Sequence, residues 1–312
     1  MKYPVRAVFA AALALTLLAL PSATLFAATP AKLHVVVIDS DGFQAFFAQE
    51  TGMFKRAGLD VEITNLAKGQ AAVEAIATGN AQIGIANTLT LAQAREHGLP
   101  ISWISPAAVA VNSNPSNAFV VWPSSPIKGA KDLSGKTVGT ISLSGLIRLT
   151  LNAWIDRNGG DSTAVKFVEL VPAQVAPSLE RGTVDAATLT DPMLTAVRPQ
   201  IRSLGNPFDG LGNPRIIVSA WFGSNEWIAQ NAQTVTAFAG AIREAARWAN
   251  DPKNAKQATA IITKYTGQQQ DLGAKSYALT FEVPALQPIF DAAVKYKMLA
   301  QPITVDKLVM RQ

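Results

Sequence analysis

A hydroxyl-rich loop in the middle of the chain has the residue types that bind an anion. Thr140, Ser142 and Ser144 alternate with aliphatic residues and precede Gly145, between a β-branched run and a helical pattern. The first N–H groups of a helix have no partner within the helix and together carry about half a positive charge. Hydroxyls beside them would complete a site for an anionic ligand oxygen. Arg148 lies one turn further along, where we expect a solvated surface arginine.

Three more loops follow predicted strands. They therefore occupy the position at which open α/β sheets bind ligands, beyond the carboxyl ends of the strands. In the first of these loops, Asp41 and Gln44 would hydrogen-bond a ligand and Phe43 would stack on it. The alternative is that the acidic residue caps a helix and that Phe43 belongs to the core.

The other two loops carry short polar side chains. Asn87 and Thr88 follow the strand QIGIA, and Asp191 follows the strand VDAATL. Each of the three is either a ligand contact or a helix cap, and Asp191 would accept from an amine or a ring N–H. Trp221 and Phe222 lie on a later strand, where they form an aromatic wall of the site or part of the core.

The sequence offers little that would perform catalysis. There are two histidines and no cysteine, and His34 lies inside a predicted strand while His97 lies at a helix end. A metal site or a Ser-His-Asp triad needs more than these, and GxSxG, HExxH and P-loop motifs are absent. We therefore expect a binding protein that is not an enzyme and that uses neither a metal nor a cofactor.

Short strands alternate with helices along the chain, which predicts an α/β fold. We expect strands at 33–38, 59–64, 82–86, 101–104, 119–122, 137–141, 165–170, 184–189 and 216–222. Helices are expected at 44–55, 71–78, 89–97, 144–158 and 172–181, and from Ser224 to the end, with Asn231 interrupting the last stretch.

Two polar segments divide this pattern. NSNPSN at 112–117 has no apolar residue, and 206–214 contains two prolines and two glycines. We predict that residues 29–112 and 215–312 form lobe I, that residues 117–212 form an inserted lobe II, and that hinges lie near 112–117 and 206–215. Two lobes joined by two crossings are able to close over a cleft.

The amino terminus has the layout of a secretory signal peptide, which we assign to residues 1–28. Lys2 and Arg6 precede an uncharged run of about 14 residues, shorter than the roughly 20 that span a bilayer. We expect cleavage after Ala27 or Ala28. The mature chain then has a formal charge of +3, from 25 basic and 22 acidic residues. Without a basic run, a nucleic-acid partner is not expected. Without a cysteine, lipid attachment is excluded, so the periplasm is the expected location.

Five sequence blocks, in this order and spacing, resemble the periplasmic receptors for nitrate, sulfonates, taurine and the thiamine pyrimidine precursor. Gln82 stands where many members of that family have aspartate. The blocks are AQETGMFKRAGLDVEI (48–63), GQAAVEAIATGNAQIGIAN (69–87), IKGAKDLSGKTVGT (127–140), SLERGTVDAATLTDP (178–192) and KYKMLAQPITVDKLV (295–309).

The resemblance implies a type II periplasmic binding protein fold with a ligand cleft between the lobes, and it places the ligand at the same four loops. It implies a monomeric receptor that delivers a small molecule to an ABC permease in the inner membrane. The acids and aromatics of the predicted site argue against a bare inorganic anion, and we expect a small organic anion, such as a sulfonate, a taurine-like molecule or a carboxylate. The alternatives are a neutral heteroaromatic, such as a thiamine pyrimidine precursor, and a ligand-binding subunit of a periplasmic sensor.

Overall fold

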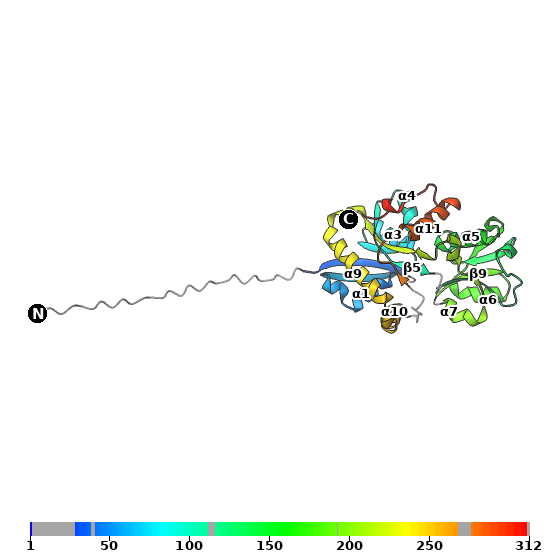
Figure 1. Ribbon diagram of the computed structural model, residues 1–312, viewed down its shortest axis with the longest axis horizontal. Helices are drawn as coiled ribbons and strands as arrows, with labels where there is room; N and C mark the ends of the chain where they lie inside the picture. Colours follow the sequence, from blue (N-terminus) through cyan, green and yellow to red (C-terminus); the bar gives the residue numbers. More distant parts are fainter. Residues whose placement is uncertain (2–28, 39–40, 112–115, 192, 268–275, 311–312) are drawn as a thin grey trace.

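The computed structural model describes residue 1 and residues 29–38, 41–111, 116–191, 193–267 and 276–310. Two lobes lie side by side, with strand β5 between them (Figure 1). Residues 2–28 of the predicted signal peptide, most of the polar segment at 112–117 and Pro192 fall outside the described residues. Among the helices of the described residues, none has the length and apolar character needed to span a membrane.

Sheet I forms the centre of lobe I. In the described residues it has five strands in the order β2-β1-β3-β12-β4, all parallel except β12. The strands are β1 (Ala31–Ile38), β2 (Leu59–Leu66), β3 (Ile83–Asn87), β4 (Ile101–Pro106) and β12 (Ser219–Ser224). Strand β12 joins this sheet from the far side of lobe II in the sequence, and it fills the place between β3 and β4.

Helices cover both faces of sheet I. One face packs against α1 (Phe43–Glu50), α2 (Met53–Arg56), α9 (Ala232–Asn250) and α10 (Ala255–Thr266). The other face packs against α3 (Gly69–Ala77), α4 (Thr88–Glu96) and α11 (Val283–Lys295). Helix α8 (Asn225–Gln230) follows β12. Asn231 separates α8 from α9, as predicted.

Sheet II forms the centre of lobe II. Its described strands have the order β10-β6-β9-β7-β8, with β7, β8 and β9 parallel and β6 antiparallel to β9. The strands are β6 (Asn117–Val121), β7 (Thr137–Thr140), β8 (Lys166–Glu169), β9 (Ala186–Thr190) and β10 (Arg202–Gly205). Helix α5 (Leu146–Arg157) covers one face, and α6 (Val175–Glu180) and α7 (Met193–Val197) cover the other.

A third, small sheet lies where the chain passes between the lobes. Its described strands are β5 (Ala108–Val111), β11 (Arg215–Ile217) and β13 (Ser276–Tyr277), in the order β11-β5-β13. The chain leaves lobe I after β5 and returns through β11. The sequence analysis missed this sheet, because its strands are two to four residues long and carry no clear alternation of apolar and polar residues.

Two predicted elements are each divided in two. The helix expected at 44–55 ends at Glu50 and restarts after Gly52, whose φ of 71° interrupts the helical backbone. The strand expected at 216–222 is divided at Val218, because its first part pairs with β5 and its second part with β3 and β4. The stretch after Ser224 is not wholly helical, since it includes β13 and an extended tail.

Helix α11 of lobe I packs against helix α5 of lobe II. Leu146 and Leu149 belong to the same buried cluster as Leu286 and Phe290. The first turns of α5, which follow the hydroxyl-rich loop, therefore rest on the core of lobe I. The loop is held in place from both lobes.

Asp156 makes the polar part of this contact. Its Oδ1 accepts from the Ser162 N–H at 2.9 Å, and its Oδ2 accepts from the Tyr296 hydroxyl at 2.8 Å, with the Lys295 Nζ at 3.6 Å. Burial alone would raise the pKa of Asp156, but the hydrogen bonds from Ser162 and Tyr296 and the charge of Lys295 outweigh burial and lower it. A carboxyl with a depressed pKa in the folded state adds stability above its unfolded pKa, and that stability is lost as the pH falls through the folded pKa.

Replacing Asp156 by asparagine is expected to lower the free energy of unfolding at neutral pH by about 1–2 kcal/mol, because two donors lose a charged acceptor. The difference from the wild type should shrink when urea unfolding is repeated near pH 3, below the ordinary aspartate pKa of about 3.9. Asp60→Asn, on an exposed residue of β2, is the control and should change neither value. An equal loss at both pH values would contradict this role for the carboxylate.

Candidate functional site

The carboxyl ends of the parallel strands of sheet II meet at one edge. Strand β7 ends there at Thr140 and β9 at Thr190, and the antiparallel β6 begins there at Asn117. The Thr190 hydroxyl donates to the Asn117 Oδ1 at 2.8 Å, which ties β9 to β6 at this edge. The hydroxyl-rich loop emerges from the same edge and leads into α5.

Side-chain hydrogen bonds shape this loop. The Thr140 hydroxyl donates to the carbonyl of Ser142 at 3.2 Å, and the Ser142 hydroxyl donates to the carbonyl of Ser144 at 2.5 Å. Within the described residues the exposed Ser144 hydroxyl makes no hydrogen bond of its own. Gly145 is the N-cap of α5, and no side chain in the described part of the chain caps this helix. Its φ is 139°, a value that residues other than glycine rarely adopt. The loop thus presents the first N–H groups of α5 without a side-chain acceptor.

Apolar side chains surround the loop. Leu143 is 49% exposed and Ile141 is 37% exposed, and Val171, two residues beyond the end of β8, is 58% exposed. Strand β8 pairs with β7 up to Thr140 and Glu169, so Val171 leaves the sheet at the same edge as the loop. Large exposed aliphatic side chains are scarce in the described residues, and three of them lie at this edge.

Arg148 differs from its expectation as a solvated surface residue. Its guanidinium carbon lies 3.3 Å from the centre of the Phe167 ring, and its Nη1 is buried without a hydrogen-bond partner in the described residues. Burial lowers the pKa of Arg148 to about 10, which leaves the side chain positively charged at neutral pH. The expectation was wrong because a residue one turn into a helix reaches back along the sheet-facing side.

In sheet I, the first candidate loop leads into α1. Asp41 is partly exposed, and its N–H donates to the carbonyl of Ile38 at 2.9 Å. Gln44 is fully buried, and its Oε1 accepts from the Trp221 Nε1 at 3.0 Å. The Gln44 Nε2 has no partner in the described residues. Both N–H donors of the Gln44 amide are therefore available beside the carboxyl end of β1.

The predicted aromatic contacts lie in the core. Phe43 is 1% exposed, and Trp221 and Phe222 have no exposed surface. The Trp221 ring meets Phe238 edge-on, with ring centres 5.4 Å apart. Phe222 packs against Gly84, where an added methyl group would lie 3.0 Å from its ring. The structure therefore places these three rings in the core, where none of them exposes a surface on which a ligand could stack.

The remaining predicted residues hold the ends of helices and strands. Asn87 caps α4, because its Oδ1 accepts from the Thr90 N–H at 2.9 Å. Thr88 is fully buried and its N–H donates to the carbonyl of Val218. The Asp191 Oδ1 accepts from the N–H and the hydroxyl of Thr195, at 3.1 and 2.7 Å. Capping is thus the visible role of Asn87 and Asp191.

Tyr277, on β13, is a polar residue at this site that the sequence analysis missed. Its ring packs edge-on against Phe47, which lies one turn after Gln44 on α1, and its hydroxyl is buried without a partner in the described residues. Burial, with a smaller contribution from the charge of Asp41, raises the pKa of Tyr277. Its strand is two residues long, so no sequence pattern pointed to it.

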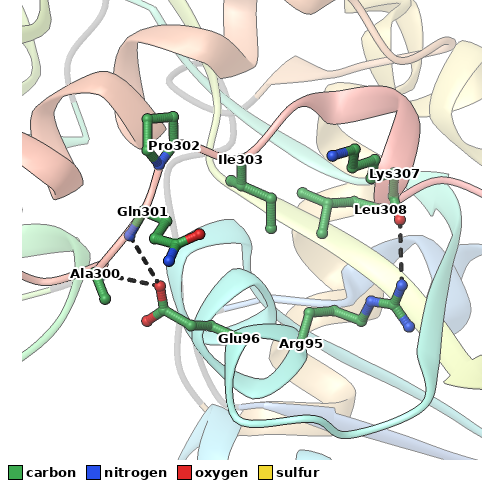
Figure 2. A pocket seen from close by; sticks show the side chains of 8 residues that line it. All are labelled: Arg95, Glu96, Ala300, Gln301, Pro302, Ile303, Lys307 and Leu308. Carbon is green, nitrogen blue, oxygen red and sulfur yellow. Dashed lines mark hydrogen bonds between the residues drawn. The ribbon is translucent and has the colours of Figure 1, made fainter.

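Two open surface pockets lie elsewhere. One, of about 390 Å³, is lined by the end of α4 and by residues near the carboxyl terminus, where Glu96 accepts from the N–H groups of Ala300 and Gln301 (Figure 2). The other, of about 750 Å³, is lined by the amino ends of β1 and β2. The first pocket lies away from the candidate loops, because α4 begins at the carboxyl edge of sheet I and runs back to the opposite edge. The second lies at that opposite edge too, because it is lined by the amino ends of the strands. Neither pocket therefore marks the candidate site, which we locate from the ends of the strands and from the polar groups that lack partners.

Comparison with known proteins gives a family match. The model of the family described as NMT1/THI5-like matches residues 41–255. A protein of Haemophilus influenzae that is named for thiamine biosynthesis is 30% identical over 149 residues, which make up 48% of this chain and 46% of that protein. The chain thus spans about half the length of this curated relative.

Solved structures share the fold at low sequence identity. The periplasmic aliphatic sulphonate-binding protein of Escherichia coli is 16% identical, with a TM-score of 0.73 over 90% of this chain and 97% of that one. A desulfurization enzyme is 15% identical, with a TM-score of 0.66 over the same shares of the two chains. The predicted two-lobed α/β fold of type II periplasmic binding proteins is confirmed.

Proposed function

Because this chain belongs to the NMT1/THI5-like family, we propose that it is the extracytoplasmic substrate-binding component of an ABC importer and that it binds a small organic anion. The observation that carries this proposal is the loop 140–145, where the N–H groups at the start of α5 have no side-chain cap in the described residues and lie beside the hydroxyl of Ser144. Such a group of donors stabilises a negative oxygen without requiring a metal. Sulfonates, taurine-like molecules and carboxylates carry such oxygens.

The surroundings of the loop support a ligand with an organic body. Ile141, Leu143 and Val171 expose aliphatic surface beside the polar donors. A bare inorganic anion gains nothing from apolar neighbours, whereas the carbon skeleton of an organic anion buries apolar area against them. The fold neighbour that binds aliphatic sulphonates is consistent with this class of ligand.

The lobes and their connections support binding by closure. Under this proposal residues 29–112 and 215–312 move as lobe I, residues 117–212 move as lobe II, and the small sheet of β5, β11 and β13 lies at the hinge. The loop 140–145 of lobe II and the Gln44 and Tyr277 side chains of lobe I would then approach the ligand from the two sides. Domain closure of this kind encloses ligands in periplasmic binding proteins.

The location follows from the first 28 residues, which we propose are removed on export to the periplasm. The partner would be an ABC permease in the inner membrane, and the receptor would act as a monomer. A neutral heteroaromatic ligand is the second candidate, because the curated relative is named for thiamine biosynthesis. The third candidate is a ligand-binding subunit of a periplasmic sensor, which would close on its ligand in the same way.

Catalysis is not part of the proposal, although one fold neighbour is an enzyme. His34 is held between the carbonyl of Asn80 and the hydroxyl of Thr64, at 2.7 and 2.8 Å. It lies toward the amino end of β1, at the opposite edge of the sheet from the candidate loops. It is therefore not placed to act as a base for the hydroxyls of loop 140–145.

A thermal-shift screen of the mature protein against sulfonates, nitrate, aromatic acids and pyrimidines tests the ligand class. A ligand present at 100 times its dissociation constant should stabilise the fold by about 2.7 kcal/mol. Ser142→Ala combined with Ser144→Ala should weaken the best anionic hit roughly tenfold, because two hydroxyl contacts to a charged oxygen are lost. Ser203→Ala, on an exposed residue of β10, is the matched control. An unchanged affinity in the double variant would remove loop 140–145 from the site.

A further inference from the structure

Three buried polar atoms of α5 and of the sheet that α5 covers lack a hydrogen-bond partner in the described residues. They are the Arg148 Nη1, the Asn152 Oδ1 and the Thr188 Oγ1. Asn152 is 8% exposed and Thr188 is 2% exposed, so neither reaches bulk water easily. Unsatisfied buried polar atoms are uncommon in folded proteins, and each costs free energy unless a partner arrives.

The three residues lie on the two surfaces that pack together, α5 and the face of sheet II that it covers. Arg148 and Asn152 are four residues apart on α5 and lie on the same stripe as Leu151 and Ile155, which pack against the sheet. On the sheet, Thr188 lies two residues from Ala186 and opposite Phe119, both of which belong to that packed face. Side chains of a strand alternate between faces, so Thr188 points toward α5.

The charge of Arg148 is not neutralised between these two surfaces. Phe167 lies opposite Val138 in the parallel ladder, and its ring carries the guanidinium. Glu169 is the acidic residue next along the same face of β8, yet it is exposed and forms no ion pair with Arg148. The pairs of the described residues all involve other basic residues. A half-buried cation without a carboxylate is destabilising on its own.

The position of the Arg148 guanidinium indicates which group would neutralise its charge. Side chains of a helix lean toward its amino terminus. The Arg148 side chain therefore extends over the first turn of α5, which directly follows loop 140–145. The same turn presents the N–H groups of α5 that no described side chain caps. A negative group bound there lies beside the charge of Arg148.

We propose that Arg148 is the residue that makes the site require a negative charge on its ligand, with Asn152 and Thr188 forming the polar layer that accommodates the guanidinium. This inference rests on the proposed function, since it concerns the same ligand site. It adds a specific discrimination: the site binds a sulfonate or a carboxylate and rejects the neutral amide of the same shape. Without Arg148, the hydroxyls and the partial charge of the N–H groups would discriminate much less between the two forms.

The test compares charged and neutral probes of matched shape. Ethanesulfonate is paired with ethanesulfonamide, and benzoate with benzamide, in calorimetric titrations of the wild type and of Arg148→Met, Arg148→Lys and Arg181→Met. We expect Arg148→Met to weaken the anion roughly tenfold to a hundredfold and to leave the amide unchanged. Arg148→Lys should keep most of the preference for the anion. Arg181, exposed at the end of α6, should change nothing.

Unliganded stability provides a second measurement. Since methionine removes an uncompensated charge while keeping the alkyl chain, the melting temperature of unliganded Arg148→Met should equal or exceed that of the wild type. An anion affinity that is the same in Arg148→Met as in the wild type overturns the inference. Equal losses in the Met and Lys variants also overturn it, because they would show that the arginine acts through its shape and not its charge.

The two proposals fail differently. If the wild type binds the amides as well as the anions, the site exists but Arg148 does not select for charge. If the wild type binds no anion in the wider screen, the proposed function fails, and a lowered melting temperature of Arg148→Met would then assign the arginine to packing alone.

Discussion

Replacing Gly210 by alanine is expected to lower the free energy of unfolding by about 3 kcal/mol. Gly210 lies in the short 3-10 turn Pro207–Leu211, which packs against the backbone of α5. A methyl group at this position would overlap the Trp154 N and lie 2.6 Å from the Ala153 carbonyl carbon. Main-chain atoms inside a helix have little freedom to retreat, so α5 and the turn must separate.

The matched control is Gly240→Ala, in the exposed face of α9. An added methyl group there meets no atom within 4 Å, and the backbone is helical. Alanine should stabilise this position by roughly 0.5–1 kcal/mol, because glycine loses more backbone freedom on folding. Urea unfolding of both variants measures the contrast. A Gly210→Ala protein as stable as the wild type would show that the turn is free to move away from α5.

Trp221→Phe is expected to lower the free energy of unfolding by about 3 kcal/mol. The smaller ring leaves a cavity beside Phe238 and removes the donor of the hydrogen bond to the Gln44 Oε1. Since the Gln44 Nε2 already lacks a partner in the described residues, the whole buried amide would then be unsatisfied.

Adding Gln44→Leu to Trp221→Phe should restore about 1 kcal/mol or more, because no buried polar group is left without a partner. The double-mutant cycle is measured by urea unfolding, and a simple sum of the two single losses would contradict the coupling. Gln44→Leu alone also tells whether Gln44 contacts the ligand or only supports Trp221. Affinity for the best ligand falls if the Nε2 donates to the ligand, and it is unchanged if the amide serves only to hold Trp221.

The sequence was sufficient to predict the alternation of strands and helices. Strong β-branched runs such as LHVVVI and glycines at helix ends mark elements whose local preference agrees with the fold. The two-lobed arrangement followed from the two polar segments, at 112–117 and 206–214, that flank the second set of strands and helices. The hinge sheet did not follow, since β13 has two residues and pairs only because distant segments bring β5 beside it.

The candidate site was predictable as a set of loops but not as a set of contacts. Strand ends located the loops at 140–145 and around Gln44 correctly on the sheet edges. Sequence alone does not give the direction of a side chain, so Phe43 and Trp221 were predicted either to contact the ligand or to belong to the core. Their burial in the structure places both in the core. Arg148 was misjudged for the same reason, since its environment depends on Phe167, which is nineteen residues away.

The place of β12 in sheet I limits the order in which the protein is able to fold. Strands β3 and β4 flank β12, which is synthesised about a hundred residues after β4, so the central edges of lobe I stay unpaired until then. Sheet II is assembled from one continuous stretch and has no such requirement. We therefore expect sheet II to be completed before sheet I, which needs the residues of β12 near 224.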